Sequence, residues 1–336
     1  MSVRAVIFGC DGHVLTADEI AFFRAVQPWG FILFGRNCGS PEQVKALTAS
    51  MREVLERENA PILIDQEGGR VQRLRGQHWR PRPAAADFGA VSRQNPRAAR
   101  DLAYDNARIM GSELYDLGIN VDCTPCVDVP VEGAHGIIGD RAFANDPWVV
   151  AGLGQSVIDG MMDSGVLPII KHLPGHGRAR ADSHMELPVV DSSREELERT
   201  DFTPFRALAR AHLGMTAHVV FSAIDPQAPA TTSKKVIDEV VRGFIGFDGL
   251  LMTDDLTMRA LKGSLAERVK ASIAAGCDMI LHCTRHMEEM REIAEATPVL
   301  SGRAMERAEQ ALAALKKPKS VEVAALQSRV DAALNG

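Results

Sequence analysis

Residues 166–177 read Val166-Leu167-Pro168-Ile169-Ile170-Lys171-His172-Leu173-Pro174-Gly175-His176-Gly177, an apolar run that ends in titratable side chains and a loop rich in glycine and proline. The apolar half is typical of a strand buried on both faces. Titratable residues at the end of such a strand are typical of an enzyme active site. The loop continues to Asp182-Ser183-His184, so three histidines, a lysine and a carboxylate lie within fourteen residues.

The alternation of a short apolar run with a longer helix-like segment occurs about eight times along the chain. This rhythm predicts an α/β fold, a closed (β/α)8 barrel of the TIM type formed as a single domain by residues 1–300. An open doubly wound sheet would need a glycine-rich phosphate turn after its first strand, and Gly9-Cys10-Asp11-Gly12 does not supply one. The expected strands are residues 5–8, 30–34, 61–65, 120–124, 167–172, 215–221, 250–254 and 278–283. The expected helices are residues 17–27, 41–58, 96–117, 147–163, 194–211, 233–245, 257–275 and 286–296.

The C-terminal residues 301–336 are alanine-rich and predict a helical extension packed on the outside of the barrel. Its two expected helices are residues 304–315 and 321–334.

The composition is that of a soluble globular protein, with 46% hydrophobic residues, 24% charged residues and a net charge of -6. Neither nucleic acid nor a membrane is an expected partner. No apolar run is long enough to span a bilayer. We expect no export, because the first residues do not read as a charged leader followed by a long apolar segment. Six scattered cysteines do not form a disulfide scaffold, so we expect a cytoplasmic protein, and a monomer.

In a barrel of this type the chemistry lies at the C-terminal ends of the strands. Those ends are strongly polar here. Carboxylates and cations that converge on one mouth should pair with each other or with a polar ligand, and such a cleft suits a sugar. The strand-end candidates are the segments Asp65 to Arg73, Lys171-His172 and Thr253-Asp254-Asp255, together with His218 and His282.

Four segments carry a resemblance to a known family. They are Ile64 to Arg73 (IDQEGGRVQR), Gly139 to Phe143 (GDRAF), Lys171 to His184, and Met252 to Met258 (MTDDLTM). In order and spacing, the chain resembles the bacterial β-N-acetylhexosaminidases of glycoside hydrolase family three, of the NagZ type.

The resemblance implies a retaining enzyme that removes a non-reducing terminal N-acetylglucosamine from muropeptide fragments in peptidoglycan recycling. Asp254 matches the nucleophile of the family, and His184 matches its acid/base, held by Asp182. No metal and no organic cofactor is implied. The positions that match binding residues for the terminal sugar are Asp65, Arg73, Arg141, Lys171 and His172.

The chemistry of these roles is reasonable on its own terms. A retaining glycosidase needs a carboxylate nucleophile and a proton donor that later acts as a base. A histidine can be that donor because its ordinary pKa of about 6.5 is close to working pH, and a nearby aspartate fixes its tautomer. Asp182 and His184 are two residues apart, so the loop must turn between them if the two side chains are to meet.

Each assignment has a structural alternative. Asp254 or Asp255 could instead cap the helix expected after them. His184 could be a solvated loop histidine, and Arg73 and Arg141 could form ion pairs at the barrel edge.

Other segments bear on other functions. The N-terminal segment resembles the start of haloacid dehalogenase-type phosphatases. Gly9 stands where the nucleophilic aspartate of those enzymes would lie, so this function is not expected. A metal site formed by His172, His176, His184 and Asp182 lacks a known spacing, and Cys123-Thr124-Pro125-Cys126 is a lone pair of cysteines. A β-glucosidase and an N-acetylglucosaminide phosphorylase remain alternatives on this scaffold, followed by a barrel metallohydrolase and a sugar-binding protein without turnover.

The chain departs from the family pattern at three positions. Leu173 stands where an aromatic residue is usual, which should affect packing more than chemistry. Arg178 and Arg180 lie in the loop that follows Gly177 and carries Asp182 and His184, which we call the catalytic loop. They could favour an anionic leaving group there or simply face solvent.

Overall fold

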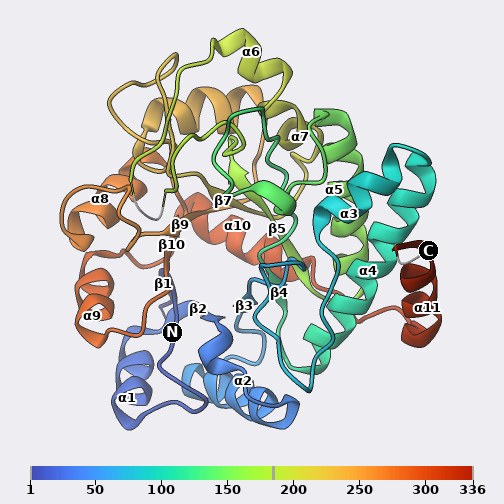
Figure 1. The fold of residues 1–336 in the computed structure, drawn as a ribbon. Coiled ribbons are helices and arrows are strands. Elements are labelled where there is room, and N and C mark those ends of the chain that lie inside the picture. The colour runs from blue at the N-terminus through green and yellow to red at the C-terminus, as the bar shows by residue number, and fades with distance from the viewer. Residues whose placement is uncertain (1, 184–185, 335–336) are drawn as a thin grey trace.

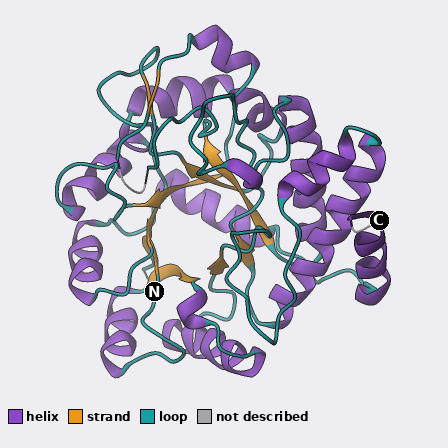
Figure 2. Ribbon diagram, in the orientation of Figure 1, coloured by secondary structure: helices purple, strands orange, loops and turns teal. Residues whose placement is uncertain are grey.

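The structure, a computed structural model, describes residues 2–183 and 186–334. Its centre is a closed barrel of eight parallel strands surrounded by helices, which confirms the predicted (β/α)8 fold (Figure 1; Figure 2). The order around the barrel is β1-β10-β9-β7-β5-β4-β3-β2. The barrel strands are β1 (Arg4–Phe8), β2 (Pro28–Leu33), β3 (Ile62–Ile64), β4 (Val121–Asp122), β5 (Leu167–Leu173), β7 (Leu213–Thr216), β9 (Leu250–Asp255) and β10 (Met279–His282).

The barrel closes between its first and last strands, where Phe8 of β1 is in register with His282 of β10. Alternate strand residues point inward and fill the barrel, whereas the residues between them pack under the helices. This two-sided burial explains the continuous apolar runs in the sequence. The inward-facing set includes Ile7, Ile32, Leu63, Val121, Ile169, Met215, Met252 and Leu281.

Several of the helices around the barrel begin at clear sequence signals. Three of them start with a capping side chain followed by proline, at Ser40-Pro41, Asn95-Pro96 and Asp146-Pro147. They are α1 (Ala17–Val26), α2 (Pro41–Leu55), α4 (Pro96–Asp116), α5 (Pro147–Asp163), α6 (Arg194–Arg199), α7 (Phe202–Ala207), the π-helix η4 (Val236–Phe244), α8 (Leu265–Ala275) and α9 (Met287–Ala296).

Three expected elements are divided or begin much later than expected. The helix expected at 194–211 is two helices, α6 and α7, because Pro204 lacks an N–H and is tolerated only in the first turn of a new helix. The helix expected at 257–275 begins only at α8, where Gly263 has a positive φ of 85° and Ser264 forms a capping box with Glu267. The strand expected at 215–221 is divided between β7 and β8 (Val220–Phe221), and β8 pairs with β6 (Val189–Val190) in a separate small sheet.

Several short elements were not predicted. The helix α3 (Ala85–Ser92) packs against α4, and three 3-10 turns occur in loops of the described residues. These turns are η1 (Gly35–Asn37), η2 (Gly139–Arg141) and η3 (Ala230–Thr232).

The two C-terminal helices, α10 (Gly302–Ala313) and α11 (Val323–Leu334), occupy different places. Ala308 and Ala311 of α10 join the inner barrel core beneath the N-terminal ends of the strands, and α10 crosses behind the barrel in Figure 1. The expected packing on the outside therefore describes α11, which lies against α4, but not α10. A domain division at residue 300 stays a prediction.

No helix in the part of the chain that the structure describes is long and apolar enough to cross a membrane.

Candidate active site

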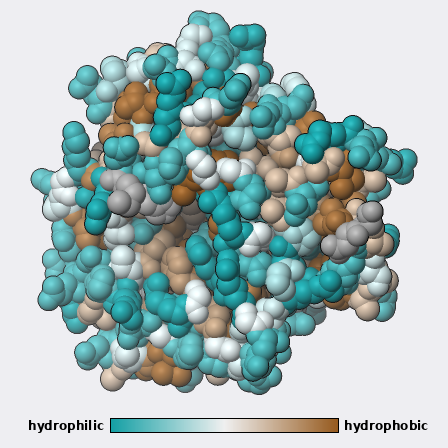
Figure 3. All heavy atoms as spheres, in the orientation of Figure 1, coloured by the Kyte–Doolittle hydropathy of each residue, from teal (hydrophilic) through white to brown (hydrophobic). Residues whose placement is uncertain are grey.

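A cavity of about 250 Å³ opens at the C-terminal ends of the barrel strands. Figure 3 shows this face, where mostly hydrophilic side chains surround a hollow at the barrel mouth. Six of the eight predicted site residues line the cavity: Asp65, Arg73, Arg141, Lys171, His172 and Asp254. The remaining lining residues are Ile32, Glu67, Arg70, Val71, Ile137, Met215, Leu281 and Cys283.

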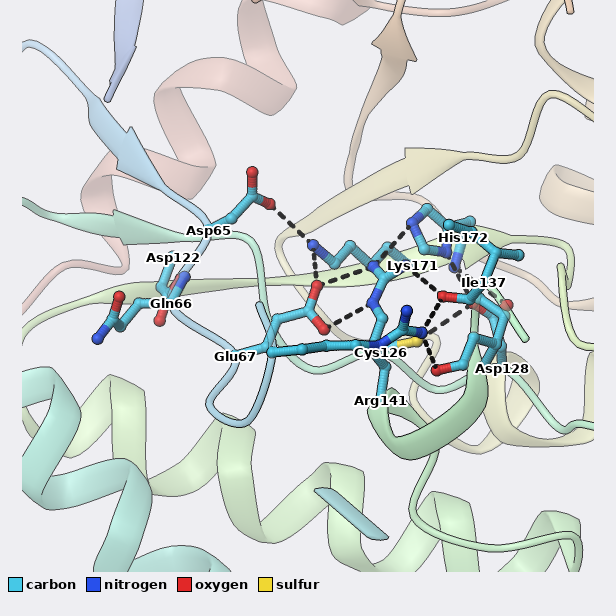
Figure 4. Close-up of polar contacts among 12 residues, drawn as sticks. Asp65, Gln66, Glu67, Asp122, Cys126, Asp128, Ile137, Arg141, Lys171 and His172 are labelled. Carbon is cyan, nitrogen blue, oxygen red and sulfur yellow. Dashed lines mark hydrogen bonds and ion pairs between the residues drawn. The ribbon is translucent and has the colours of Figure 1, made fainter. Parts of the chain in front are cut away.

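Charged side chains of alternating sign form a continuous chain along the cavity. Arg73 donates to Asp65 at 2.9 Å, and Lys171 donates to the other oxygen of Asp65 at 2.9 Å. Lys171 Nζ also lies 2.6 Å from Glu67, which forms a two-bond pair with Arg141 at 2.8 and 2.9 Å. Lys171 thus lies between the two carboxylates (Figure 4). We call these five residues the ionic chain.

The ionic chain keeps its members charged although they are largely buried. Burial alone would raise the pKa of Glu67, but Arg141 and Lys171 outweigh it and lower that pKa to about 2. Burial opposes ionisation of Asp65 too, yet Lys171 and Arg73 hold its pKa well below the usual range. The two carboxylates in turn raise the pKa of Lys171 against the effect of burial. The cavity therefore presents fixed donors and acceptors, as recognition of sugar hydroxyls requires.

His172 is oriented by a carboxylate outside the ionic chain. Asp128, which follows β4, lies 2.7 Å from His172 Nδ1. Burial alone would raise the pKa of Asp128, but His172 outweighs burial and keeps that pKa well below its usual range. Because the carboxylate accepts from Nδ1–H, the other ring nitrogen, Nε2, is left to face Arg141 at 3.4 Å. His172 is thus held in one orientation at the cavity.

Asp254 and Asp255, adjacent at the end of β9, have different surroundings. Asp255 accepts from the backbone N–H of Thr257 at 3.1 Å and from the Thr257 hydroxyl at 2.7 Å. Asp254 lines the cavity and accepts from the backbone N–H of Asp255 at 2.8 Å. Burial would raise the pKa of Asp254, but His172, His218 and that N–H lower it. The capping alternative thus describes Asp255, and it caps a turn, since no helix follows directly.

The two other strand-end histidines are held by structural contacts. His218 hydrogen-bonds Thr231 Oγ1 at 2.7 Å and the carbonyl oxygen of Asp255 at 3.0 Å, and burial lowers its pKa. His282 contacts Glu289 at 3.2 Å and Thr284 at 3.0 Å. His218 therefore supports the strand end that carries Asp254, and neither histidine lines the cavity.

The catalytic loop is described up to Ser183, whereas His184 lies outside the described residues. The carbonyl oxygen of Asp182 accepts from the N–H of Glu186 at 3.0 Å. The turn expected between Asp182 and His184 stays a prediction. The roles of Asp182 and His184 remain predictions.

Arg178 anchors the start of this loop to α6 and α7. Its guanidinium contacts Asp201 at 2.6 Å and Glu196 at 2.7 Å. Because those carboxylates engage its donors, Arg178 is a structural residue, and of the two loop arginines only Arg180 is exposed.

One group among the described residues could offer three ligands to a metal ion: Cys126, Asp128 and His172. It differs from the set considered in the sequence, and Cys123 is not part of it. Asp128 already bonds His172 Nδ1 at 2.7 Å and Cys126 Sγ at 3.2 Å, so these contacts account for the arrangement as a hydrogen-bonded group.

Sequence reasoning missed Glu67, Asp128 and Cys283. Glu67 lies in the quoted strand-end segment, and the conformation of that segment places it in the cavity. Gly68 has φ of 99°, and a Cβ there would lie 2.1 Å from the Pro83 carbonyl oxygen, so only glycine fits. Asp128 lies six residues beyond β4, and no signal in the sequence connects it to His172.

Replacement of Glu67 tests the ionic chain. We expect Glu67→Gln to lower the free energy of unfolding by about 3 kcal/mol, because removing one partner of a buried ion pair leaves the other charge uncompensated. Glu67 is only 6% exposed in its side chain and pairs with two cations. Urea denaturation at pH 7 measures the change.

The matched control is Glu306→Gln on α10, whose partner Arg303 lies 2.8 Å away in an exposed pair. We expect this control to leave stability unchanged, as is common for exposed pairs. Equal effects of the two substitutions would show that the ionic chain does not stabilise the barrel.

The low pKa of Glu67 also predicts a pH dependence. A carboxyl group with a depressed folded-state pKa contributes stability above its unfolded pKa, and this is lost as pH falls through the folded value. The wild-type free energy of unfolding should therefore fall between about pH 4.5 and pH 2. Denaturation curves at pH 7, 4 and 3 measure it, and Glu67→Gln should show a smaller decline. An identical decline in both proteins would contradict the assignment.

Comparisons with known proteins agree with this geometry. Residues 23–317 match the family model "Glycosyl hydrolase family 3 N terminal domain". A β-hexosaminidase of Alkalilimnicola ehrlichii is 41% identical over 302 residues, which are 89% of this chain and 85% of that protein.

Solved structures give the same result. NagZ of Neisseria gonorrhoeae, in complex with N-trifluoroacetyl-D-glucosamine, has a TM-score of 0.85 and 31% identity over 100% of this chain and 97% of its own. A family 3 β-N-acetylglucosaminidase of Paenibacillus sp. has the same TM-score and identity over 98% of this chain, which spans 66% of that longer one. On the family match, which extends over most of its length, the chain belongs to glycosyl hydrolase family 3, a family of glycoside hydrolases.

Proposed function

We propose that this protein is a retaining β-N-acetylhexosaminidase that removes a non-reducing terminal N-acetylglucosamine. The observation that carries the proposal is the placement of the ionised Asp254 in a cavity lined by the ionic chain. The names of the relatives support the same activity: one is a β-hexosaminidase, and another is a NagZ in complex with an N-acylated glucosamine.

In the proposed mechanism, Asp254 attacks the anomeric carbon while the bond to the leaving oxygen breaks. His184, supported by Asp182, gives its proton to that oxygen, and a covalent glycosyl-enzyme forms on Asp254. His184 then takes a proton from water, and the resulting hydroxide equivalent attacks the anomeric carbon, which releases Asp254 and the sugar. The two displacements retain the anomeric configuration. No step requires a metal or an organic cofactor.

The sugar-binding residues supply orientation in this proposal. Asp65 would accept from sugar hydroxyls, whereas Arg73, Lys171 and Arg141 would donate to hydroxyl or acetamido oxygens. His172, held by Asp128, presents a ring nitrogen to the same cavity. Apolar side chains of Ile32, Met215 and Leu281 line the cavity as well and suit the carbon face of a sugar ring.

We propose muropeptide fragments as the substrate and peptidoglycan recycling in the cytoplasm as the setting, with the protein acting as a monomer. The exposed Arg180 lies on the catalytic loop and is suited to an anionic aglycone such as peptide-bearing muramic acid.

Paired chromogenic substrates test the activity. The β-N-acetylglucosaminide should be hydrolysed quickly and the β-glucoside slowly, with no effect of EDTA or phosphate. Preference for the glucoside would make the enzyme a β-glucosidase. A rate and a product that change with phosphate would make it a phosphorylase, and absence of turnover of both sugars would leave a sugar-binding protein.

A further inference from the structure

Ser183 lies between the two residues of the proposed acid/base dyad and is held from two sides. The residue is buried, with 3% of its surface exposed. Its hydroxyl lies 3.0 Å from Nε2 of His176, and its carbonyl oxygen accepts from the N–H of Ala260 at 3.3 Å. Ser183 thus connects the catalytic loop to both the β5 side and the β9 side of the barrel mouth.

His176 is fixed by contacts with the segment that follows β4. Its backbone N–H donates to Asp128 Oδ1 at 2.7 Å, and the residue is also only 3% exposed. The next residue, Gly177, packs directly on the carbonyl of Val129, where a Cβ would lie 2.0 Å from the oxygen. Because the backbone here leaves no room to shift, the His176 ring is a rigid attachment point.

The His176 ring has no other polar attachment in the described parts of the chain. Burial, together with the neighbouring His172, lowers the pKa of His176 to about 4, so the ring is neutral at working pH. Nδ1 is buried and has no hydrogen-bond partner among residues 2–183 and 186–334. A buried imidazole with one bond out of two is costly, so the bond to Ser183 is the polar contact that accounts for a histidine here.

We propose that His176 is a positioning residue that fixes, through the Ser183 hydroxyl, the loop carrying the acid/base dyad. The inference rests on the proposed function, since it assigns a task to that dyad. It adds a role for the second histidine of the Lys171 to Gly177 motif and for the serine between Asp182 and His184. Neither residue lines the cavity that holds Asp254.

The proposal predicts a selective defect. When the Ser183–His176 bond is absent, the loop samples more positions and proton transfer to the leaving oxygen becomes less frequent. A substrate with a good leaving group needs no proton, so its first step should be unaffected. General acid–base catalysis contributes about 10²–10⁴-fold, and losing its positioning should cost part of that, roughly tenfold.

The experiment compares kcat/KM of wild type and Ser183→Ala on two β-N-acetylglucosaminides, the phenyl and the 2,4-dinitrophenyl. We expect a loss of roughly tenfold on the phenyl substrate and a change within about twofold on the activated one. Equal losses on both substrates, or no loss on either, would overturn the proposal.

A double-mutant cycle with His176→Leu checks that the two residues act as one unit. We expect the double variant to be no slower on the phenyl substrate than the slower single variant, whereas multiplied defects would overturn the link. If His176→Leu does not fold, Ser183→Ala still decides. Its matched control is Ser164→Ala, a buried serine at the end of α5, beside the N-terminal end of the barrel, which should act like wild type on both substrates.

His184→Ala in the same assay separates this inference from the proposed function. If His184→Ala lowers kcat/KM equally on both substrates, the acid/base assignment fails, whatever the result for Ser183→Ala. If His184→Ala is selective and Ser183→Ala is not, only the role of His176 and Ser183 fails.

Discussion

Asp254→Ala is expected to abolish turnover, with a fall in kcat of about 10⁴-fold or more, as is typical when a covalent nucleophile is removed. The structure supports a large effect because Asp254 lines the cavity and its pKa is lowered by His172 and His218 against the effect of burial. The fold should survive, since its side chain makes one described hydrogen bond, to the N–H of Asp255. Hydrolysis of the 2,4-dinitrophenyl β-N-acetylglucosaminide measures the loss.

Azide separates a missing nucleophile from a damaged site. In Asp254→Ala, azide should enter the space left by the carboxylate and give an α-glycosyl azide, the inverted product. Asp255→Asn is the matched control, because amide oxygen can still accept from the N–H of Thr257, and it should keep most of the activity. Substantial activity of Asp254→Ala without added azide would refute the assignment, as would an equal loss in Asp255→Asn.

The barrel could be predicted from the sequence because burial on both faces gives each strand an uninterrupted apolar run. β5 and β9 were found to within one residue at either end, at 167–172 and 250–254. The errors have local causes: Pro204 divides one expected helix, and Gly263 with Ser264 delays another. The position of α10 could not be read from its composition, because an alanine-rich helix suits the end of a barrel as well as its outside.

The site could be predicted in part. What could not be predicted are the contacts between residues that lie far apart in the sequence. Residues at strand ends, such as Asp65, Lys171 and Asp254, converge because the fold brings all strand ends to one mouth. Asp128 could not be found in this way, because it lies in a loop and reaches His172 across 44 positions in sequence. The pairing of Glu67 with two cations likewise depends on where the loops after β3 and β4 meet.

The ionic chain gives these separate residues one physical purpose. An isolated buried lysine or carboxylate would tend to become neutral, whereas alternation of sign keeps each member charged. Lys171 illustrates this, since its two carboxylate partners raise its pKa despite burial. A site built in this way stays polar and rigid before substrate arrives, and hydrogen bonds to a sugar then need little reorganisation.

His184→Ala is expected to slow hydrolysis of the phenyl β-N-acetylglucosaminide by about 10²–10⁴-fold, the usual contribution of general acid–base catalysis. The dinitrophenolate leaves without a proton, so kcat/KM on the 2,4-dinitrophenyl substrate should change little. Its kcat should still fall, because breakdown of the glycosyl-enzyme needs the base. Steady-state rates on both substrates measure the difference.

Two further results separate an acid/base from a residue that merely shapes the loop. In the wild type, kcat/KM on the phenyl substrate should fall at high pH, because the donated proton is lost there. This fall should disappear in His184→Ala. Azide, which needs no general base, should restore kcat on the activated substrate and give the β-glycosyl azide, the retained product. Asp254→Ala with azide should give the opposite anomer, because only one displacement occurs in that variant. If both variants gave the same anomer, Asp254 and His184 could not hold the two roles assigned to them.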